Sequence, residues 1–220
     1  IYLCILSMGL LSTFYTVLGG IEAVIWTDVF QVIIFFGGII VALVIIPFHI
    51  EGGVIELFKT GIADDKFRIL YLEWDMTATT FWAVVIGGGV GTLFSYTADQ
   101  SMIQRYLTTK DEKAAAKGLW LNVAMKIPTG LLFYFMATAL YVYYKSNPSS
   151  LNMGMQNDAI LPLFISQKIP VGLAGFVIAA IFSAAMSSLD SGMNSMATAF
   201  VTDFYRRFKP NASEHSCLNL

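Results

Sequence analysis

The sequence predicts an all-α membrane protein, and three observations carry that prediction. Of the 220 residues, 56% are hydrophobic and only 13% are charged. The mean hydropathy is +0.68. Soluble domains carry about 25% charged residues, so this chain has too few charges for a surface that faces water on all sides. Apolar stretches long enough to cross a bilayer recur along the chain, and no basic stripe with interleaved aromatic residues points to nucleic-acid binding.

The apolar stretches predict the individual helices. A helix needs about 20 mainly apolar residues to cross the hydrocarbon core. We expect transmembrane helices over residues 2–18, 27–48, 79–99, 118–144 and 173–204. They form one transmembrane domain over residues 1–209, followed by a polar cytoplasmic tail over residues 210–220. Because the first residue already lies inside an apolar stretch, we expect the sequence to be a fragment of a longer protein.

The distribution of basic residues predicts the orientation in the membrane. The loop 100–117 carries four lysines and arginines, and three more follow the last apolar stretch within residues 206–209. Cytoplasmic loops carry an excess of Lys and Arg. We therefore expect a multi-pass plasma-membrane protein with loop 100–117 and the C-terminus in the cytoplasm. The acidic segment 49–78 and the connection 145–172 then lie outside.

The last predicted helix carries a stripe of oxygen-bearing and small side chains. At about 100° per residue they share one face of the helix. The stripe consists of Ala184, Ser187, Ser188, Ser191, Asn194, Ser195, Thr198 and Thr202. Such a stripe is typical of a close contact between helices. It also fits a path for a hard cation, because hydroxyl and carbonyl oxygens are the ligands that such ions take.

Three ionisable residues fall within or next to the predicted helices, where a charge is costly. Asp190 borders the oxygen-bearing stripe and could add charge to an ion site or pair with another helix. Asp28 could be a helix-start acid stabilised by the helix dipole. Lys126 could extend its ammonium group to the interface, or face a polar cavity beside Pro128.

A run of glycines over residues 87–91 precedes a polar segment, "TLFSYTAD", at residues 92–99. Glycine at this density either permits close helix packing or allows the helix to bend near a substrate site. The residues do not decide between the two.

Three segments together resemble the sodium:solute symporter family, which includes sodium/glucose, sialic acid and monocarboxylate cotransporters. They are "YTVLGGIEAVIWTDVFQ", "DQSMIQRYLTTKDEKAAAKG" and "AAMSSLDSGMNSMATAFVTDFYRRF", in that order. The resemblance covers residues 1–209. It implies a LeuT-type fold of two inverted five-helix repeats, of which this chain holds about the fourth to eighth core helices.

The resemblance also implies site residues. For the shared sodium ion it implies the carbonyl of Ala184 and the hydroxyls of Ser187 and Ser188, with further ligands from the first core helix. Asp28, Asp190 and Ser191 fall on the positions of an additional sodium site in sialic acid transporters. The places that contact the solute fall on a set in two helices, namely Thr92, Ser95, Tyr96, Asp99 and Lys126.

The expected function is sodium-coupled symport of a small organic solute across the plasma membrane by alternating access, with Na⁺ as the coupling ion. Ser95 replaces the family's gating tyrosine and Tyr96 replaces an indole, so a hexose is not the expected solute. The alternative is a non-transporting membrane sensor or scaffold on the same fold. An enzyme is not expected, because no His, Cys or Ser-Lys constellation supports chemistry.

Overall fold

A computed structural model describes residues 2–151, 154 and 156–210 of the protein. Within these residues all regular structure is helical, with no strand. The predicted all-α fold is therefore confirmed. Of the predicted polar tail, residues 211–220 lie outside the described part of the chain.

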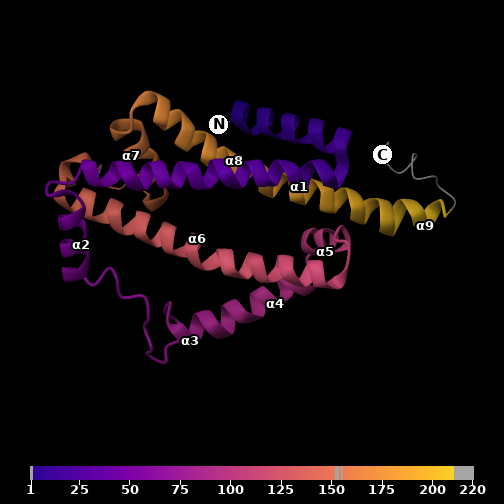
Figure 1. The fold of residues 1–220 in the computed structure, drawn as a ribbon, viewed down its shortest axis with the longest axis horizontal. Coiled ribbons are helices and arrows are strands. Elements are labelled where there is room, and N and C mark those ends of the chain that lie inside the picture. The colour runs from indigo at the N-terminus through magenta and orange to yellow at the C-terminus, as the bar shows by residue number, and fades with distance from the viewer. Residues whose placement is uncertain (1, 152–153, 155, 211–220) are drawn as a thin grey trace. The chain divides into compact units, whose positions relative to one another are not determined.

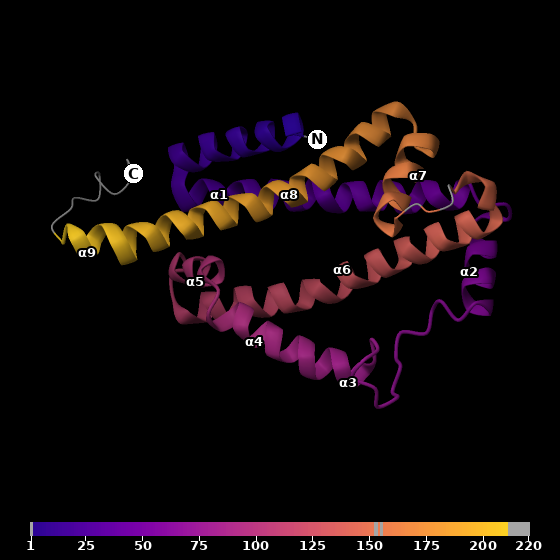
Figure 2. The same ribbon diagram turned by 180° about the vertical axis from the view of Figure 1, so that it is seen from behind.

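The first long element, α1, runs from Tyr2 to Phe48 and reverses its direction at Gly20. Gly20 has φ 58° and ψ −152°, a backbone conformation that is essentially restricted to glycine. A Cβ on the preceding Gly19 would lie 2.4 Å from the Cβ of Ala23, so both glycines are needed for the turn. Figures 1 and 2 both show the N-terminal part of α1 folded back beside the part that follows. The chain thus turns at a single residue, whereas the sequence left residues 19–26 between two helices.

The segment after α1 contains shorter helices that hydropathy did not predict. Helix α2 spans Gly53–Ala63 within the predicted acidic connection. The next predicted span consists of α3 (Phe81–Ala83), a π-helical turn over Val84–Gly88, and α4 (Gly89–Thr97). Helix α5 (Gln100–Leu107) follows at a bend of 50°. The predicted loop 100–117 is therefore wrong for residues 100–107.

Two long helices complete the chain. Helix α6 spans Glu112–Ser146, and α7 (Ile160–Lys168) follows two short 3-10 turns. Helix α8 spans Val171–Ala199, and a π-helical segment (Phe200–Tyr205) joins it to α9 (Arg206–Phe208). Helix α6 begins before the predicted residue 118, because hydropathy marks only the apolar part of a helix and not its polar first turns.

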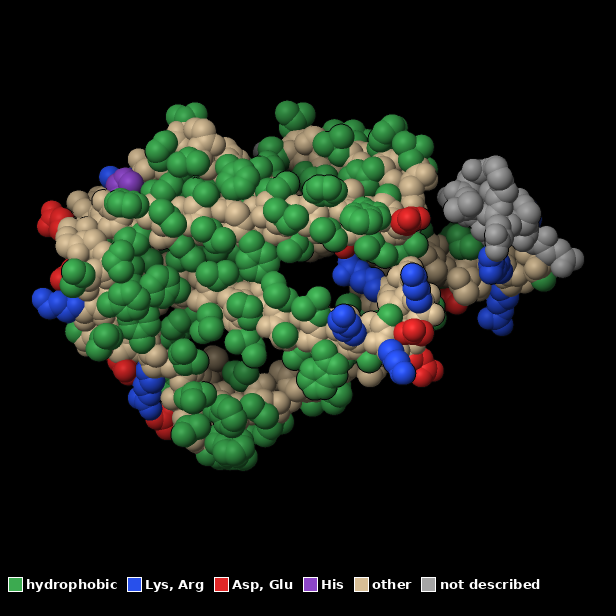
Figure 3. All heavy atoms as spheres, viewed as in Figure 1, with side chains coloured by type: hydrophobic (Ala, Val, Ile, Leu, Met, Phe, Trp, Pro, Cys, Tyr) green, Lys and Arg blue, Asp and Glu red, His purple; other side chains and the backbone are tan. Residues whose placement is uncertain are grey.

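Within the described part of the chain, the helices that are long and apolar enough for a membrane span are α1, α6 and the combined Val171–Phe208. The bent pair Phe81–Thr97 and Gln100–Leu107 adds a fourth. The 47 residues of α1 are divided at Gly20 into two helical lengths. On the face drawn in Figure 3, hydrophobic side chains cover the long helices, and charged ones gather near α2, α5 and α9.

The chain divides into two units. The first comprises residues 1–33, 90–112 and 182–220, and the second comprises residues 34–89 and 113–181. The buried apolar cluster, which includes Ile46, Leu57, Val142 and Phe164, lies in the second unit. The predicted ion ligands all lie in the first unit.

Candidate functional site

Asp28, on the second part of α1, is the centre of a polar cluster that joins three helices of the first unit. Arg105 of α5 donates from Nη2 to Asp28 Oδ2 at 2.5 Å and to Ser191 Oγ of α8 at 2.8 Å. Ser187 of α8 donates its hydroxyl to the other carboxylate oxygen of Asp28 at 2.5 Å. The negative charge of Asp28 is therefore compensated by a guanidinium group. The helix-start alternative is wrong, because Asp28 lies inside the second part of α1 and not at its first turn.

Asp190 lies in a different set of contacts. Its side chain is fully buried and accepts hydrogen bonds from the hydroxyls of Ser12 and Tyr15, both on the first part of α1. Gln31 donates from Nε2 to Asp190 Oδ2 at 3.4 Å. Consecutive residues of a helix point about 100° apart, so Asp190 and Ser191 contact different partners. Asp28 and Ser191 thus share Arg105 as a hydrogen-bond donor. The hydrogen-bond partners of Asp190 are different residues, and all of them lie on α1.

The three residues expected to hold the shared sodium ion lie along one turn of α8. The hydroxyl of Ser188 lies 3.3 Å from the carbonyl oxygen of Ala184. This contact is the hydrogen bond that a helical serine makes to the carbonyl one turn back. Hydroxyl and carbonyl oxygens are also the ligand types that a hard cation takes.

The predicted solute residues of α4, Thr92, Ser95 and Tyr96, share one helix face, because their positions follow the helical repeat, whereas Asp99 lies beyond the end of α4. Thr92 and Ser95 are exposed, and Ser95 donates to the carbonyl of Gly91 at 3.1 Å. Asp99 caps α5, since its carboxylate accepts from the backbone N–H of Ser101 at 2.8 Å and from its hydroxyl at 2.5 Å.

Tyr96 is half-buried on the same α4 face. Lys126 is exposed on α6, in the second unit. The glycines of the predicted span have no close packing role among the described residues, because a Cβ at Gly87, Gly89 or Gly91 would meet nothing within 4 Å. The π-helical turn lies at this glycine run, in line with the bending alternative.

Several residues of these clusters were not singled out from the sequence. The sequence alone indicates Arg105 only as one of the basic residues of the predicted cytoplasmic loop. It gives no reason to group Ser12, Tyr15 and Gln31 with Asp190. Asn194 of α8 donates from Nδ2 to Gln104 Oε1 at 2.6 Å. Gln31 is buried within an apolar helix, and such polar residues in membrane spans are themselves a signal of function.

Long apolar helices with a buried carboxylate are typical of multi-pass membrane proteins, in which a buried ionisable residue marks a candidate functional site. The sodium:solute symporter family profile matches residues 1–219. The chain belongs to this family, and the resemblance read from its three segments is confirmed.

Several characterised proteins are similar to this chain. It is 38% identical over 209 residues to the sodium/sialic acid symporter SiaT of Proteus mirabilis, covering 94% of this chain and 42% of that protein. It is 30% identical over 224 residues to the sodium-dependent multivitamin transporter of Oryctolagus cuniculus, covering 100% of this chain and 35% of that protein. The first relative is named as a symporter and the second as a transporter, and neither is named as an enzyme. The chain spans less than half of their length.

The fold is also similar to a solved structure, the substrate-bound, outward-open state of a Na⁺-coupled sialic acid symporter. The TM-score is 0.87 at 36% sequence identity, over 96% of this chain and 45% of that one. The expected LeuT-type architecture is thereby confirmed for the part of the fold that this chain covers.

Proposed function

We propose that the protein is a sodium-coupled symporter that moves a small organic solute across the plasma membrane by alternating access. The observation that carries the proposal is the match of residues 1–219 to the sodium:solute symporter family, with Ala184, Ser187 and Ser188 along one turn of α8. Relatives that couple transport to Na⁺ support it.

In this proposal Na⁺ is bound by the hydroxyls of Ser187 and Ser188 and by the carbonyl of Ala184. None of these ligands carries a fixed charge, so the ion can leave without exposing a buried carboxylate. Ser187 also donates to Asp28, which pairs with Arg105 of α5. If Ser187 turns its hydroxyl oxygen to the ion, its hydrogen bond to Asp28 changes, and Asp28 in turn contacts Arg105 of α5. Helix α5 is therefore one element that responds to sodium in this proposal.

The solute in this proposal is a small organic acid that lies against the exposed polar face of α4. Thr92, Ser95 and Tyr96 supply hydroxyl groups, and Asp99 fixes the start of α5 behind them. Relatives named for sialic acid and for monocarboxylates, which are both carboxylic acids, support this solute class.

We place the α5–α6 connection and the C-terminus in the cytoplasm. Lys110, Lys113 and Lys117 surround this connection, and Arg206 and Arg207 follow the last long helix. The excess of Lys and Arg at these two places supports this orientation.

The coupling in this proposal is differential binding. Sodium favours the outward-facing state and raises the affinity for the solute, and by linkage the solute raises the affinity for sodium by the same factor. Neither ligand alone drives transport, because alternating access requires that the doubly occupied state be favoured.

Uptake into proteoliposomes tests the proposal. The full-length protein is reconstituted and given labelled sialic acid, a monocarboxylate, a vitamin, iodide or a hexose, with Na⁺ or choline outside. We expect uptake of one organic acid with Na⁺ and at least about tenfold less with choline.

Ser188→Ala should weaken this uptake, because it removes one sodium ligand. Ser195→Ala is the matched control, since Ser195 makes the same kind of hydrogen bond to a carbonyl one turn back on α8, at 2.7 Å. Uptake that does not change when choline replaces Na⁺ would refute sodium coupling. No uptake of any compound would favour the sensor or scaffold alternative.

A further inference from the structure

The second unit holds an apolar cavity of about 690 Å³ beside helix α6. Its walls come from α6, from the connection that follows this helix and from the first turn of α7. The apolar lining residues include Phe133, Met136, Leu140 and Leu161. Pockets of about 300–1,000 Å³ are the ones that hold small molecules. The size and the walls of this cavity therefore fit an apolar ligand or the apolar part of one.

The lining of the cavity changes from apolar to polar along α6. Tyr141, Tyr144 and Lys145 line it in the last turns of the helix. Phe133 lies about 18 Å before Lys145 along the helix axis, at about 1.5 Å per residue. Tyrosine and lysine side chains are typical of the level at which a membrane helix leaves the hydrocarbon core. The cavity thus runs from hydrocarbon depth to headgroup level, which matches a ligand with an apolar tail and a polar head.

The polar end of the cavity carries an excess of positive charge. Lys145 donates to the carboxylate of Asp64, which also accepts from the Tyr141 hydroxyl at 3.2 Å. The Lys66 ammonium lies 4.2 Å from the centre of the Tyr141 ring, and Lys66 forms no ion pair within the described part of the chain. Asp64 neutralises only one of these two ammonium groups. The remaining positive charge complements an anionic headgroup.

We propose that this cavity binds an acyl chain of an anionic phospholipid, whose phosphate group lies beside Lys66 and Lys145. The lipid comes from the leaflet at this end of α6, which is the outer leaflet in the orientation proposed above. The inference does not depend on sodium-coupled symport, because all of its residues lie in the second unit, away from the predicted ion ligands of the first.

The charge at the polar end favours a lipid over another occupant. An apolar helix from the rest of the longer protein would cover the walls of the cavity, but it would leave the positive charge of Lys66 without a partner. A soluble anion such as phosphate would pair with Lys66, but it would leave the apolar walls uncovered. An anionic phospholipid satisfies both parts of the site.

Titration of the delipidated full-length protein with phosphatidylglycerol in detergent tests this site. Phosphatidylcholine with the same acyl chains is the reference, because its headgroup has no net charge. We expect phosphatidylglycerol to raise the melting temperature more than phosphatidylcholine does, and to be retained as a bound lipid in native mass spectrometry. Glycerol 3-phosphate, which carries the anionic group without an acyl chain, should give no shift.

Lys66→Gln tests the contact with the headgroup. It should weaken the binding of phosphatidylglycerol about fivefold, the scale of one basic residue at an anionic membrane surface, and leave phosphatidylcholine unchanged. Lys59→Gln is the matched control, because Lys59 is also an exposed lysine of the second unit. It pairs with Glu56 of the same helix α2 at 3.8 Å and does not line the cavity.

Ala137→Trp tests the contact with the acyl chain, because a large side chain at this lining position fills the cavity. The retained phosphatidylglycerol should be lost, together with the difference between the two lipids. Ala124→Trp is the matched control, since Ala124 is an exposed alanine on the same helix α6 that does not line the cavity.

Three outcomes would overturn the inference. Equal shifts with the two lipids would exclude recognition of an anionic headgroup. Retention of phosphatidylglycerol by Ala137→Trp at the wild-type level would place the lipid elsewhere on the protein. No retained lipid in the wild type would mean that another part of the longer protein fills the cavity. If Ala137→Trp gives no monodisperse protein, the comparison of Lys66→Gln with Lys59→Gln decides, because both side chains are exposed.

Discussion

The two units of the chain differ in what they bury. In the second unit the fully buried side chains are apolar, including Ile46, Leu57, Val142 and Phe164. In the first unit the fully buried side chains include Ser12 and Asp190, with Val24 as the apolar exception. The buried polar atoms that lack a partner among the described residues all lie in the first unit: Thr16 Oγ1, Gln31 Oε1, Gln104 Nε2 and Tyr106 Oη.

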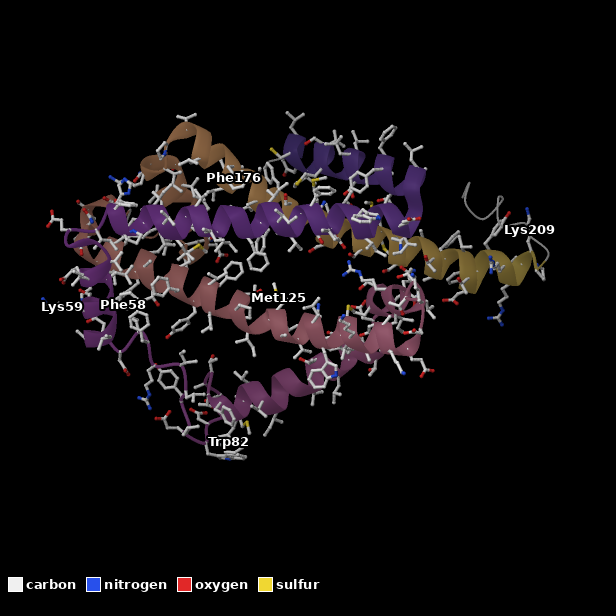
Figure 4. All side chains as sticks on the ribbon, in the orientation of Figure 1. Phe58, Lys59, Trp82, Met125, Phe176 and Lys209 are labelled. Atoms are coloured by element: carbon white, nitrogen blue, oxygen red, sulfur yellow. The ribbon has the colours of Figure 1, made fainter. Side chains whose placement is uncertain are left out.

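This difference separates a region packed through apolar side chains from a region that buries polar side chains. Within lipid, apolar burial drives little helix association, so packing relies on close contact of small residues. Glycine supplies that contact in the second unit, where a Cβ on Gly37 would lie 3.0 Å from the ring of Phe176, a side chain labelled in Figure 4. The buried polar groups of the first unit include four atoms without a partner among the described residues, so this unit is held together less by apolar packing than the second.

The largest expected effect comes from filling the close contact in the second unit. A Cβ on Gly38 would lie 2.3 Å from the Cβ of Ala180 and 3.5 Å from the Cα of Val177. We expect Gly38→Val to remove most of the monodisperse peak of the full-length protein in size-exclusion chromatography, because overpacking costs about 1–3 kcal/mol or more.

Gly38→Ala combined with Ala180→Gly should recover much of that peak, since the second change vacates the space. Gly175→Ala is a control on α8, the helix that carries Ala180, because a Cβ at Gly175 would meet nothing within 4 Å. Equal yields for Gly38→Val and Gly175→Ala would show that close contact does not hold this unit together.

An intermediate effect is expected from breaking the ion pair of the first unit. Arg105→Met leaves Asp28 without its cation, and Asp28→Asn leaves Arg105 without its anion. Each single variant should lower the thermal stability of the full-length protein. The loss in the double variant should be smaller than the sum of the two single losses, because the pair is already broken in each single variant. We expect a coupling energy of about 0.5–3 kcal/mol for side chains in direct contact.

Arg105→Lys should not restore the wild-type stability. Arg105 donates to Asp28 and to Ser191 from the one nitrogen Nη2 at the end of its long side chain, and a lysine ammonium on a shorter chain replaces the delocalised guanidinium by a strongly hydrated point charge. Additive effects of Arg105→Met and Asp28→Asn would contradict a specific pair and reduce the contrast between the two units.

The smallest effect is expected at a polar contact of the second unit, outside its apolar core. Asp64 follows α2 and accepts hydrogen bonds from the Lys145 ammonium and from the Tyr141 hydroxyl, the latter at 3.2 Å. The bond from Lys145 holds the pKa of the Asp64 carboxyl below its usual value. A lowered carboxyl pKa stabilises the folded state above the pKa of the unfolded chain, and this contribution is lost as pH falls through the folded value.

Thermal melting in detergent at pH 7 and at successively lower pH should therefore show a small advantage of wild type over Lys145→Met at pH 7. The advantage should shrink as Asp64 is protonated, and it should weaken in high salt because exposed pairs are screened. A constant difference at every pH would mean that Lys145 acts through packing of its hydrocarbon chain.

Hydropathy and motif spacing predicted the fold class and the family because both depend on residues close in sequence. The serine motif at residues 187–191 is local, and so is the apolar length of a span. The same reasoning missed α2 because its 11 residues are too few for a membrane span, and it missed α5 because the polar residues of that helix lower the mean hydropathy. It also missed the single-residue turn at Gly20, where one backbone conformation replaced a predicted connection.

The sequence by itself determined that this is an all-α membrane protein of the sodium:solute symporter family, and it placed polar groups at membrane depth. Only the tertiary structure decided which polar groups meet. Arg105 reaches Asp28 across 77 positions of the chain, and Ser12 reaches Asp190 across 178. The physical reason is that a carboxylate is stabilised by whichever donors the packed helices bring within hydrogen-bond distance, and that proximity is not encoded in local spacing.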